Sequence, residues 1–146
     1  MSTTKRRRAA QAGVTLIEML VVVTIIALFA SIVGLRMWRQ AGKAQTTAAR
    51  AQIGIFMGAL NMYKMDTGVF PTNEQGLQAL RVAPAGVTNW QGPYLEREIP
   101  NDPWQRPYIY HFPSEQGDEP EIISYGSDGQ PGGEGSAADI VSWKNQ

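Results

Sequence analysis

An apolar run near the N-terminus, from Val14 to Leu35, constrains this chain more than any other feature. As a helix the run would be roughly 33 Å long, at about 1.5 Å per residue, which is enough to cross a hydrocarbon core of about 30 Å. A basic cluster, Lys5 to Arg8, comes just before it. Basic residues hold the adjoining end of a span on the cytoplasmic side. The sequence therefore predicts one membrane span, with the rest of the chain exported.

Two residues at the start of the run, Gly13 and Glu18, set it apart from an ordinary secretory signal. Such a signal has a shorter apolar core and a small-residue cleavage site after it, and neither is present here. A plain signal anchor remains an alternative, because it explains the length and the basic cluster. It does not explain Glu18, since a charge within a span is costly and usually has a partner. A cut after Gly13 would leave a free amine close to that carboxylate.

The block at this boundary resembles the prepilin signal of type IV pilins and type II secretion pseudopilins, in the residues Gly13-Val14-Thr15-Leu16-Ile17-Glu18. The resemblance implies a peptidase cut between Gly13 and Val14, methylation of Val14, and a role for Glu18 in assembly. Val14 departs from the family, whose first mature residue is usually Phe. On this interpretation residues 1–13 are a cleaved leader, 14–35 a transmembrane assembly helix, and 36–146 a periplasmic domain.

Composition excludes several classes of function. The formal net charge is zero, but four of the 13 basic residues lie in the leader, so the mature chain has 13 − 4 = 9 basic against 13 acidic residues. No basic patch points to nucleic acid. The chain has no cysteine, which excludes a disulfide framework and a thiolate metal site. His111 is the single histidine, and no nucleophile–base set is recognisable, so we expect no enzyme.

Beyond the span, the helical pattern continues to about Asp66, with apolar residues at three- and four-residue spacing. A short helix is predicted over residues 74–82. A connection rich in proline and glycine follows. It has three aromatic residues that could be buried, Trp90, Tyr94 and Trp104, so we expect it to pack as a specific loop. Short strands are predicted at 108–112, 121–125 and 139–143. The fold class is therefore α+β, with a long N-terminal helix packed on a small antiparallel sheet.

Between the last two predicted strands lies a polar, glycine-rich loop, residues 126–136. It has too little apolar area to order itself by burial. Asp128 and Asp139 flank it, and hard carboxylate and carbonyl oxygens suit Ca²⁺. The spacing does not match an EF-hand, so the residues alone leave two interpretations open, a calcium site and a solvated acidic loop.

Further blocks resemble the G-type major pseudopilin of type II secretion, over nearly the whole mature chain. The most specific are Gln75-Gly76-Leu77-Gln78-Ala79-Leu80, Gly92-Pro93-Tyr94-Leu95 and Asp102-Pro103-Trp104. The resemblance implies a calcium site with the side chains of Asp128 and Asp139 and the backbone carbonyls of Tyr125 and Ser127. Two residues depart from the family pattern. Ala138 stands where many members have a second acid, for which Glu134 or Ser136 could substitute, and Gln105 stands where Gly is usual.

The resemblance implies a structural subunit that waits in the bacterial inner membrane and polymerises into a periplasmic pseudopilus. Its expected partners are other copies of itself, minor pseudopilins, the inner-membrane secretion platform and the prepilin peptidase. One rival is another pilin-like subunit, adhesive or minor, which would favour a disulfide loop. A second rival is a signal-anchored periplasmic enzyme or binding protein, which would keep an intact N-terminus and carry a pocket with convergent polar groups.

Overall fold

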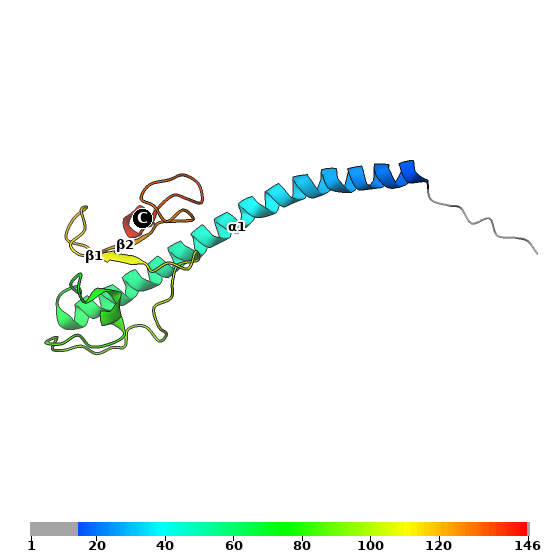
Figure 1. The fold of residues 1–146 in the computed structure, drawn as a ribbon. Coiled ribbons are helices and arrows are strands. Elements are labelled where there is room, and N and C mark those ends of the chain that lie inside the picture. Colours follow the sequence, from blue (N-terminus) through cyan, green and yellow to red (C-terminus); the bar gives the residue numbers. More distant parts are fainter. Residues whose placement is uncertain (1–14, 146) are drawn as a thin grey trace, which may run out of the picture. The chain divides into compact units, whose positions relative to one another are not determined.

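A computed structural model describes residues 15–145 of the chain, apart from the side chains of residues 34–40 and 145. In chain order its elements are helix α1 (Leu16–Thr67), the 3₁₀ helix η1 (Gly76–Leu80), the strands β1 (Ile109–His111), β2 (Glu121–Ser124) and β3 (Ile140–Val141), and the 3₁₀ helix η2 (Ser142–Asn145) (Figure 1). The chain divides into two compact units, Met1–Arg39 and Gln40–Gln146, and residues of α1 belong to both. Each unit is described by itself below. The predicted cleavage site at Gly13 and Val14 lies outside the described residues.

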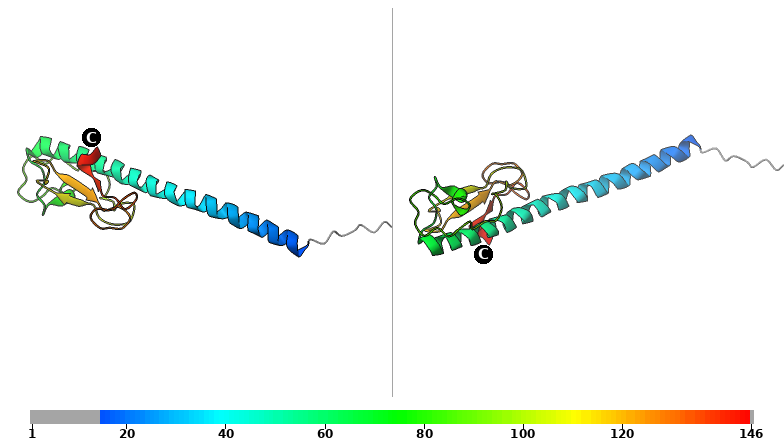
Figure 2. Two further views of the ribbon diagram at one scale, coloured as in Figure 1. Left: turned by 90° about the horizontal axis from the view of Figure 1, so that it is seen from above. Right: turned by 90° about the horizontal axis from the view of Figure 1, so that it is seen from below.

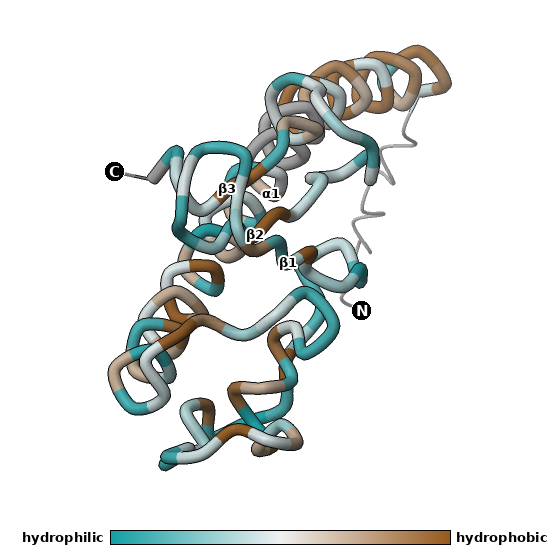
Figure 3. The backbone as a smooth tube through the Cα atoms, turned by 90° about the vertical axis from the view of Figure 1, so that its left-hand side faces the viewer, coloured by the Kyte–Doolittle hydropathy of each residue, from teal (hydrophilic) through white to brown (hydrophobic). Residues whose placement is uncertain are grey.

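The first unit contributes the apolar start of α1. Its stretch Leu16–Val33 has a mean hydropathy of 2.8 and none of it is buried, which fits the predicted membrane span. Figure 3 colours this stretch largely brown, for hydrophobic residues. Its hydroxyl groups are satisfied within the helix, because Thr24 donates to the Leu20 carbonyl at 2.7 Å and Ser31 to the Leu28 carbonyl at 2.8 Å. Internal hydrogen bonding of this kind is what a segment in lipid requires.

In the second unit, the later part of α1 supplies one wall of the hydrophobic core. Ile53, Phe56, Leu60 and Tyr63 recur at three- and four-residue spacing and are at most 1% exposed. That spacing places them on one face of the helix. The Phe56 ring meets the Tyr108 ring edge-on, with 5.2 Å between centroids. The amphipathic continuation of the helix that the sequence predicts is therefore confirmed.

The three strands form an antiparallel sheet in the order β1-β2-β3, and both views in Figure 2 show it alongside the later part of α1. Its inward face includes the paired residues Tyr110 and Ile122, and Ile140 from β3. The strands are shorter than predicted. The third ends at Val141 rather than at 143, because η2 begins at Ser142 and its hydroxyl accepts a hydrogen bond from the Ile122 N–H.

The predicted helix over residues 74–82 is also shorter, and it is a 3₁₀ helix confined to Gly76–Leu80. Gly76 has φ +55°, so a right-handed helix cannot run through it from Glu74. At the other end, the Leu80 carbonyl accepts from the Tyr94 N–H at 2.8 Å. The start and the end of η1 are thus set by a backbone conformation and by a contact distant in sequence.

The connection between η1 and β1 is ordered, as the sequence predicts from its aromatic residues. Trp90 donates its ring N–H to the Ala79 carbonyl at 2.9 Å, and Tyr94 donates its hydroxyl to the Asp66 carboxylate at 2.8 Å. The Arg81 guanidinium donates to the carbonyls of Leu95 and Glu96 at 2.7 and 3.0 Å. Partly buried rings with their polar atoms paired fix this segment without regular secondary structure.

Candidate functional site

The first candidate site is the start of α1. Thr15 precedes the helix, and its hydroxyl oxygen accepts from the Glu18 N–H at 3.3 Å. This is the arrangement of an N-cap residue, and Thr-x-x-Glu is the sequence of a capping box. Glu18 lies in the first turn, where the helix dipole favours a negative charge. The local sequence therefore starts the helix so that the carboxylate stands at its positive end.

Among the described side chains of residues 15–144, no hydrogen bond or ion pair reaches the Glu18 carboxylate. The neighbouring side chains are apolar and exposed, with Leu16 88% and Ile17 68% exposed. The Val14 amine that cleavage would create lies outside the described residues. The described part of this site is thus a carboxylate on an apolar helix, without a partner among the described residues.

The second candidate site is the loop from Tyr125 to Asp139, drawn in orange to red in Figure 1. Two of its turns are joined by a hydrogen bond from the Ser127 N–H to the Ser136 carbonyl, at 2.9 Å. Gly126 has φ +57°, and a Cβ at this position would come within 2.9 Å of the Ala137 carbonyl. The two sides of the loop therefore touch backbone to backbone, which only glycine permits here.

The predicted metal ligands have different surroundings in this loop. One Asp139 carboxylate oxygen accepts from the Gly132 N–H at 2.8 Å, and the other is buried without a hydrogen-bond partner. Asp128 is exposed, and its carboxylate accepts from the Gln130 N–H at 3.1 Å. Tyr125 and Ser127, the predicted carbonyl ligands, flank Gly126. In the part of the chain that the structure describes, no three acidic or histidine side chains gather as a metal cluster.

An unpartnered buried carboxylate oxygen costs free energy, and a bound cation would remove that cost. The Asp139 carboxylate is a hard oxygen donor, as are the backbone carbonyls of the loop, and Ca²⁺ prefers donors of this kind. The residues present therefore fit a calcium ion at Asp139. The structure does not supply a third carboxylate from the position of Ala138.

A tight turn beside the loop is organised around Asp102, which is only 2% exposed. One carboxylate oxygen accepts from the N–H groups of Trp104 and Arg106, at 3.0 and 2.9 Å, and the other accepts from the Ser124 hydroxyl at 2.6 Å. Gln105 has φ +68°, the left-handed conformation that glycine adopts without strain. The turn thus keeps a glycine-type backbone although Gln occupies it.

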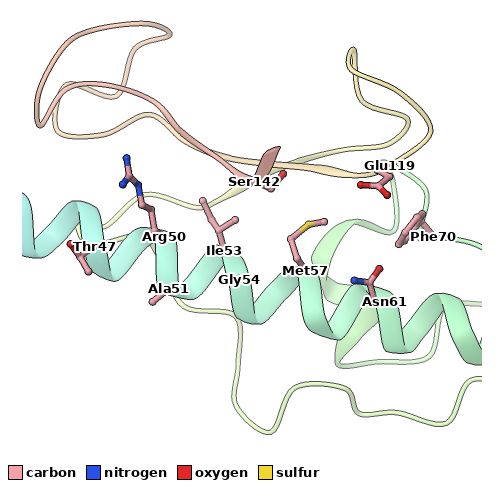
Figure 4. A pocket seen from close by; sticks show the side chains of 10 residues that line it. All are labelled: Thr47, Arg50, Ala51, Ile53, Gly54, Met57, Asn61, Phe70, Glu119 and Ser142. Atoms are coloured by element: carbon pink, nitrogen blue, oxygen red, sulfur yellow. The ribbon is translucent and has the colours of Figure 1, made fainter. Parts of the chain in front are cut away.

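A groove of roughly 640 Å³ lies between α1 and the C-terminal part of the second unit (Figure 4). Its walls include Arg50, Met57, Glu119 and Ser142. The Ser142 hydroxyl accepts a backbone hydrogen bond, and no histidine or cysteine lines the groove. The groove therefore carries no nucleophile–base pair, and His111 is exposed on β1.

Comparison with known proteins assigns the chain to a family. Residues 36–143 match the family model for the type II secretion system (T2SS), protein G, and residues 8–34 match the prokaryotic N-terminal methylation motif. The chain belongs to the type II secretion system protein G family. This membership and the fold confirm the family resemblance seen in the sequence.

Curated relatives of this family are similar to the chain over almost its full length. The type II secretion system core protein G of Pseudomonas aeruginosa is 37% identical over 95% of this chain and 99% of its own length. That of Vibrio cholerae is 40% identical over 93% and 94%. A crystal structure of the major pseudopilin of enterohaemorrhagic Escherichia coli is 31% identical, covers 72% of this chain and 91% of its own, and superposes with a TM-score of 0.60. The α+β, pilin-like fold is thereby confirmed.

Three residues with evident structural roles were not predicted from the sequence. Thr15 could have been found, because Thr-x-x-Glu before an apolar run is a helix-start signal. Asp102 stands in a block typical of the family, but its role depends on Ser124, which is distant in sequence. Arg106 carries no local signal, since its partner is the Gly126 carbonyl, at 2.6 Å.

Proposed function

We propose that the mature chain is a structural subunit that polymerises into the periplasmic pseudopilus of a type II secretion system. The observation that carries the proposal is the start of α1, where exposed apolar side chains surround a carboxylate without a partner in the described chain. A membrane alone would accommodate the apolar side chains. It would not accommodate the carboxylate, which costs several kcal/mol in hydrocarbon.

Polymerisation would supply a partner for the Glu18 carboxylate from a neighbouring copy. In a filament, Glu18 of one copy would face the Val14 amine of its neighbour, and the apolar helices would pack at the filament centre. An ion pair between two copies lowers the cost of keeping each charge away from water. Family membership supports a structural role, and we expect no catalytic activity from this chain.

Processing by the prepilin peptidase is required before this pairing can form. We expect the cut between Gly13 and Val14, followed by methylation of the Val14 amine. The match of residues 8–34 to the N-terminal methylation motif supports this step. Intact-mass analysis of membrane-extracted protein tests it, because a chain that keeps Lys5 to Arg8 in cells with active peptidase would contradict the proposed cut.

We place the subunit in the inner membrane with its N-terminus cytoplasmic and residues 36–146 periplasmic. The basic cluster before the apolar run supports this orientation. Protease added to spheroplasts should digest the C-terminal unit. Protection of that unit would show that it lies on the cytoplasmic side and would contradict the proposed orientation. Minor pseudopilins and the inner-membrane platform are the further partners that assembly would require.

We also propose that the loop binds one Ca²⁺ through the carboxylates of Asp128 and Asp139 and the carbonyls of Tyr125 and Ser127. The partnerless oxygen of Asp139 supports the site. The bound ion would supply a fixed double positive charge that holds both sides of the loop together. The order of the loop, and of β3 directly after it, would then depend on calcium.

Glu18→Ala tests the assembly proposal. The variant should insert into the membrane and be cleaved, but it should form no filaments by electron microscopy and should not support secretion. Glu115→Ala is the matched control, because it removes an exposed carboxylate from the second unit. Normal filaments from Glu18→Ala would contradict the role of this residue. Loss of cleavage would instead show that the peptidase reads Glu18.

A further inference from the structure

Arg106 lies between the turn at Asp102 and the loop between β2 and β3. Its backbone is fixed on one side, because its N–H donates to Asp102 and its carbonyl accepts from the Asp102 N–H at 2.7 Å. Asp102 is itself fixed to β2 through the Ser124 hydroxyl. The side chain of Arg106 therefore projects from an anchored base.

The guanidinium contacts the loop at two points. One terminal nitrogen donates to the Gly126 carbonyl at 2.6 Å, the short distance expected of a charge-assisted hydrogen bond. The other lies against Gly129, where a Cβ would overlap it. Gly129 has φ +70°, and its N–H donates to the Tyr125 carbonyl at 3.0 Å. Arg106 thus fixes both ends of the segment 126–129.

This segment contains or adjoins most of the proposed calcium ligands. The Gly126 carbonyl that Arg106 occupies lies between the two proposed carbonyl ligands, on Tyr125 and Ser127. Asp128 immediately precedes Gly129. A planar guanidinium can hold a carbonyl while it packs against a flat backbone surface, which an ammonium group cannot do equally well.

We infer that Arg106 is a positioning residue that orders the segment 125–129 with a charge built into the chain, before any metal binds. Calcium then has to fix only the second side of the loop, which carries Asp139. The part of the inference that concerns calcium affinity rests on the proposed calcium site. The ordering of the segment by Arg106 does not.

Amide hydrogen exchange of the mature full chain in detergent, with a chelator present, tests the ordering directly. In Arg106→Gln, the Ser127 and Gly129 amides should exchange about tenfold faster or more, because a charge-assisted hydrogen bond is lost. Arg106→Lys should restore only part of the protection. Gly129→Ala should reproduce the loss from the other side of the contact.

Arg81→Gln is the matched control, because Arg81 also donates its guanidinium to backbone carbonyls, in the connection before β1. The Arg81→Gln variant should show unchanged amide exchange in the loop, even if its melting temperature falls as much as that of the Arg106→Gln variant. Unchanged exchange at Ser127 and Gly129 in Arg106→Gln, or equal acceleration in Arg81→Gln, would overturn the inference.

Calorimetric titration with calcium alone then separates the two proposals. If the wild-type chain binds calcium, Arg106→Gln should bind it several-fold more weakly and Arg81→Gln should bind it unchanged; equal affinity in Arg106→Gln would overturn the role of Arg106 toward the metal. If the wild-type chain binds no calcium near millimolar concentration, the proposed metal site fails. The exchange result then decides the ordering role of Arg106 by itself.

Discussion

The two units of this chain treat apolar surface in opposite ways. Between Leu16 and Val33 every residue is exposed, whereas in the second unit the large apolar residues from α1 and the sheet are buried against each other. Burial of apolar surface is the main favourable term in folding. The second unit therefore holds its own stabilisation, and the first obtains it from lipid or from other chains. This difference is what a subunit needs if it must be stable alone and still polymerise.

A smaller version of the contrast exists within the second unit. The connection between η1 and β1 is fixed by partly buried aromatic side chains such as Trp90 and Tyr94. The loop between β2 and β3 has no aromatic residues between Gly126 and Asp139. Backbone hydrogen bonds and Arg106 contact it, and the proposed calcium ion would add a further tie. The first should be insensitive to ions in solution, and the second should respond to them.

The largest effect should come from truncating the core of the second unit. Ile122 is fully buried on β2, so Ile122→Ala should lower the free energy of unfolding by about 2–5 kcal/mol. Leu28→Ala, in the exposed apolar stretch, should leave this unfolding transition unchanged. Thermal unfolding of the mature chain in detergent measures both. Equal destabilisation by the two substitutions would contradict the claim that only the second unit is stabilised by burying its own apolar residues.

Removal of calcium from the loop between β2 and β3 should have the next largest effect on the free energy of unfolding. At a calcium concentration about a hundredfold above the dissociation constant, binding adds about 2.7 kcal/mol to the free energy of unfolding, which a chelator would remove. Added calcium should restore the melting temperature. Magnesium should restore it poorly, because it requires tighter octahedral geometry.

Two variants assign this calcium response to the loop. Asp128→Ala and Asp139→Ala should each abolish the response, whereas Trp90→Ala in the connection should lower the melting temperature with the response intact. A melting temperature that ignores both chelator and calcium in the wild-type chain would show that the loop is held without metal.

Alkaline pH should destabilise the sheet-facing core. Burial, with a further contribution from the negative charge of Asp102, raises the pKa of Tyr108 to about 12, and burial also raises the pKa of Tyr110. The unfolded chain releases these protons near the ordinary pKa of 10.0. The free energy of unfolding should therefore be unaffected below pH 10 and should fall as the pH rises from 10 to about 12. Tyr108→Phe should weaken this dependence in unfolding measured across that range.

The smallest predicted effect concerns the turn at Asp102. Gln105→Gly removes the strain of a side chain at φ +68° and should raise the free energy of unfolding by about 1 kcal/mol or less, since glycine also gains freedom in the unfolded chain. Gln78→Gly, in the 3₁₀ helix, is a suitable control and should be destabilising. A loss of stability in Gln105→Gly would show that the Gln side chain contributes more than its backbone strain costs.

Much of the fold could be predicted because its signals are local. The long helix follows from helix-forming residues and from apolar spacing that continues to Tyr63, and each strand has a β-branched or aromatic run. The ends of elements were less predictable. The end of β3 depends on Ser142 accepting a bond from Ile122, and the start of η1 depends on the conformation of Gly76.

The candidate sites divide in the same way. Glu18 was identifiable because a carboxylate in an apolar run is conspicuous in the sequence alone. The organisation around Asp102 and Arg106 was not, because it joins a turn to a strand and a loop about 20 residues away. The roles of Gly13 and Val14 in processing, and of Asp128 and Asp139 in calcium binding, stay predictions.

The central claim is that the exposed start of α1 is completed by other copies through Glu18. The most direct test expresses wild-type and Glu18→Ala chains together and measures their ratio by mass spectrometry, in membranes and in purified filaments. The variant should be strongly depleted from filaments relative to membranes, whereas Glu115→Ala should keep the same ratio in both. Equal incorporation of the Glu18→Ala chain would contradict the account.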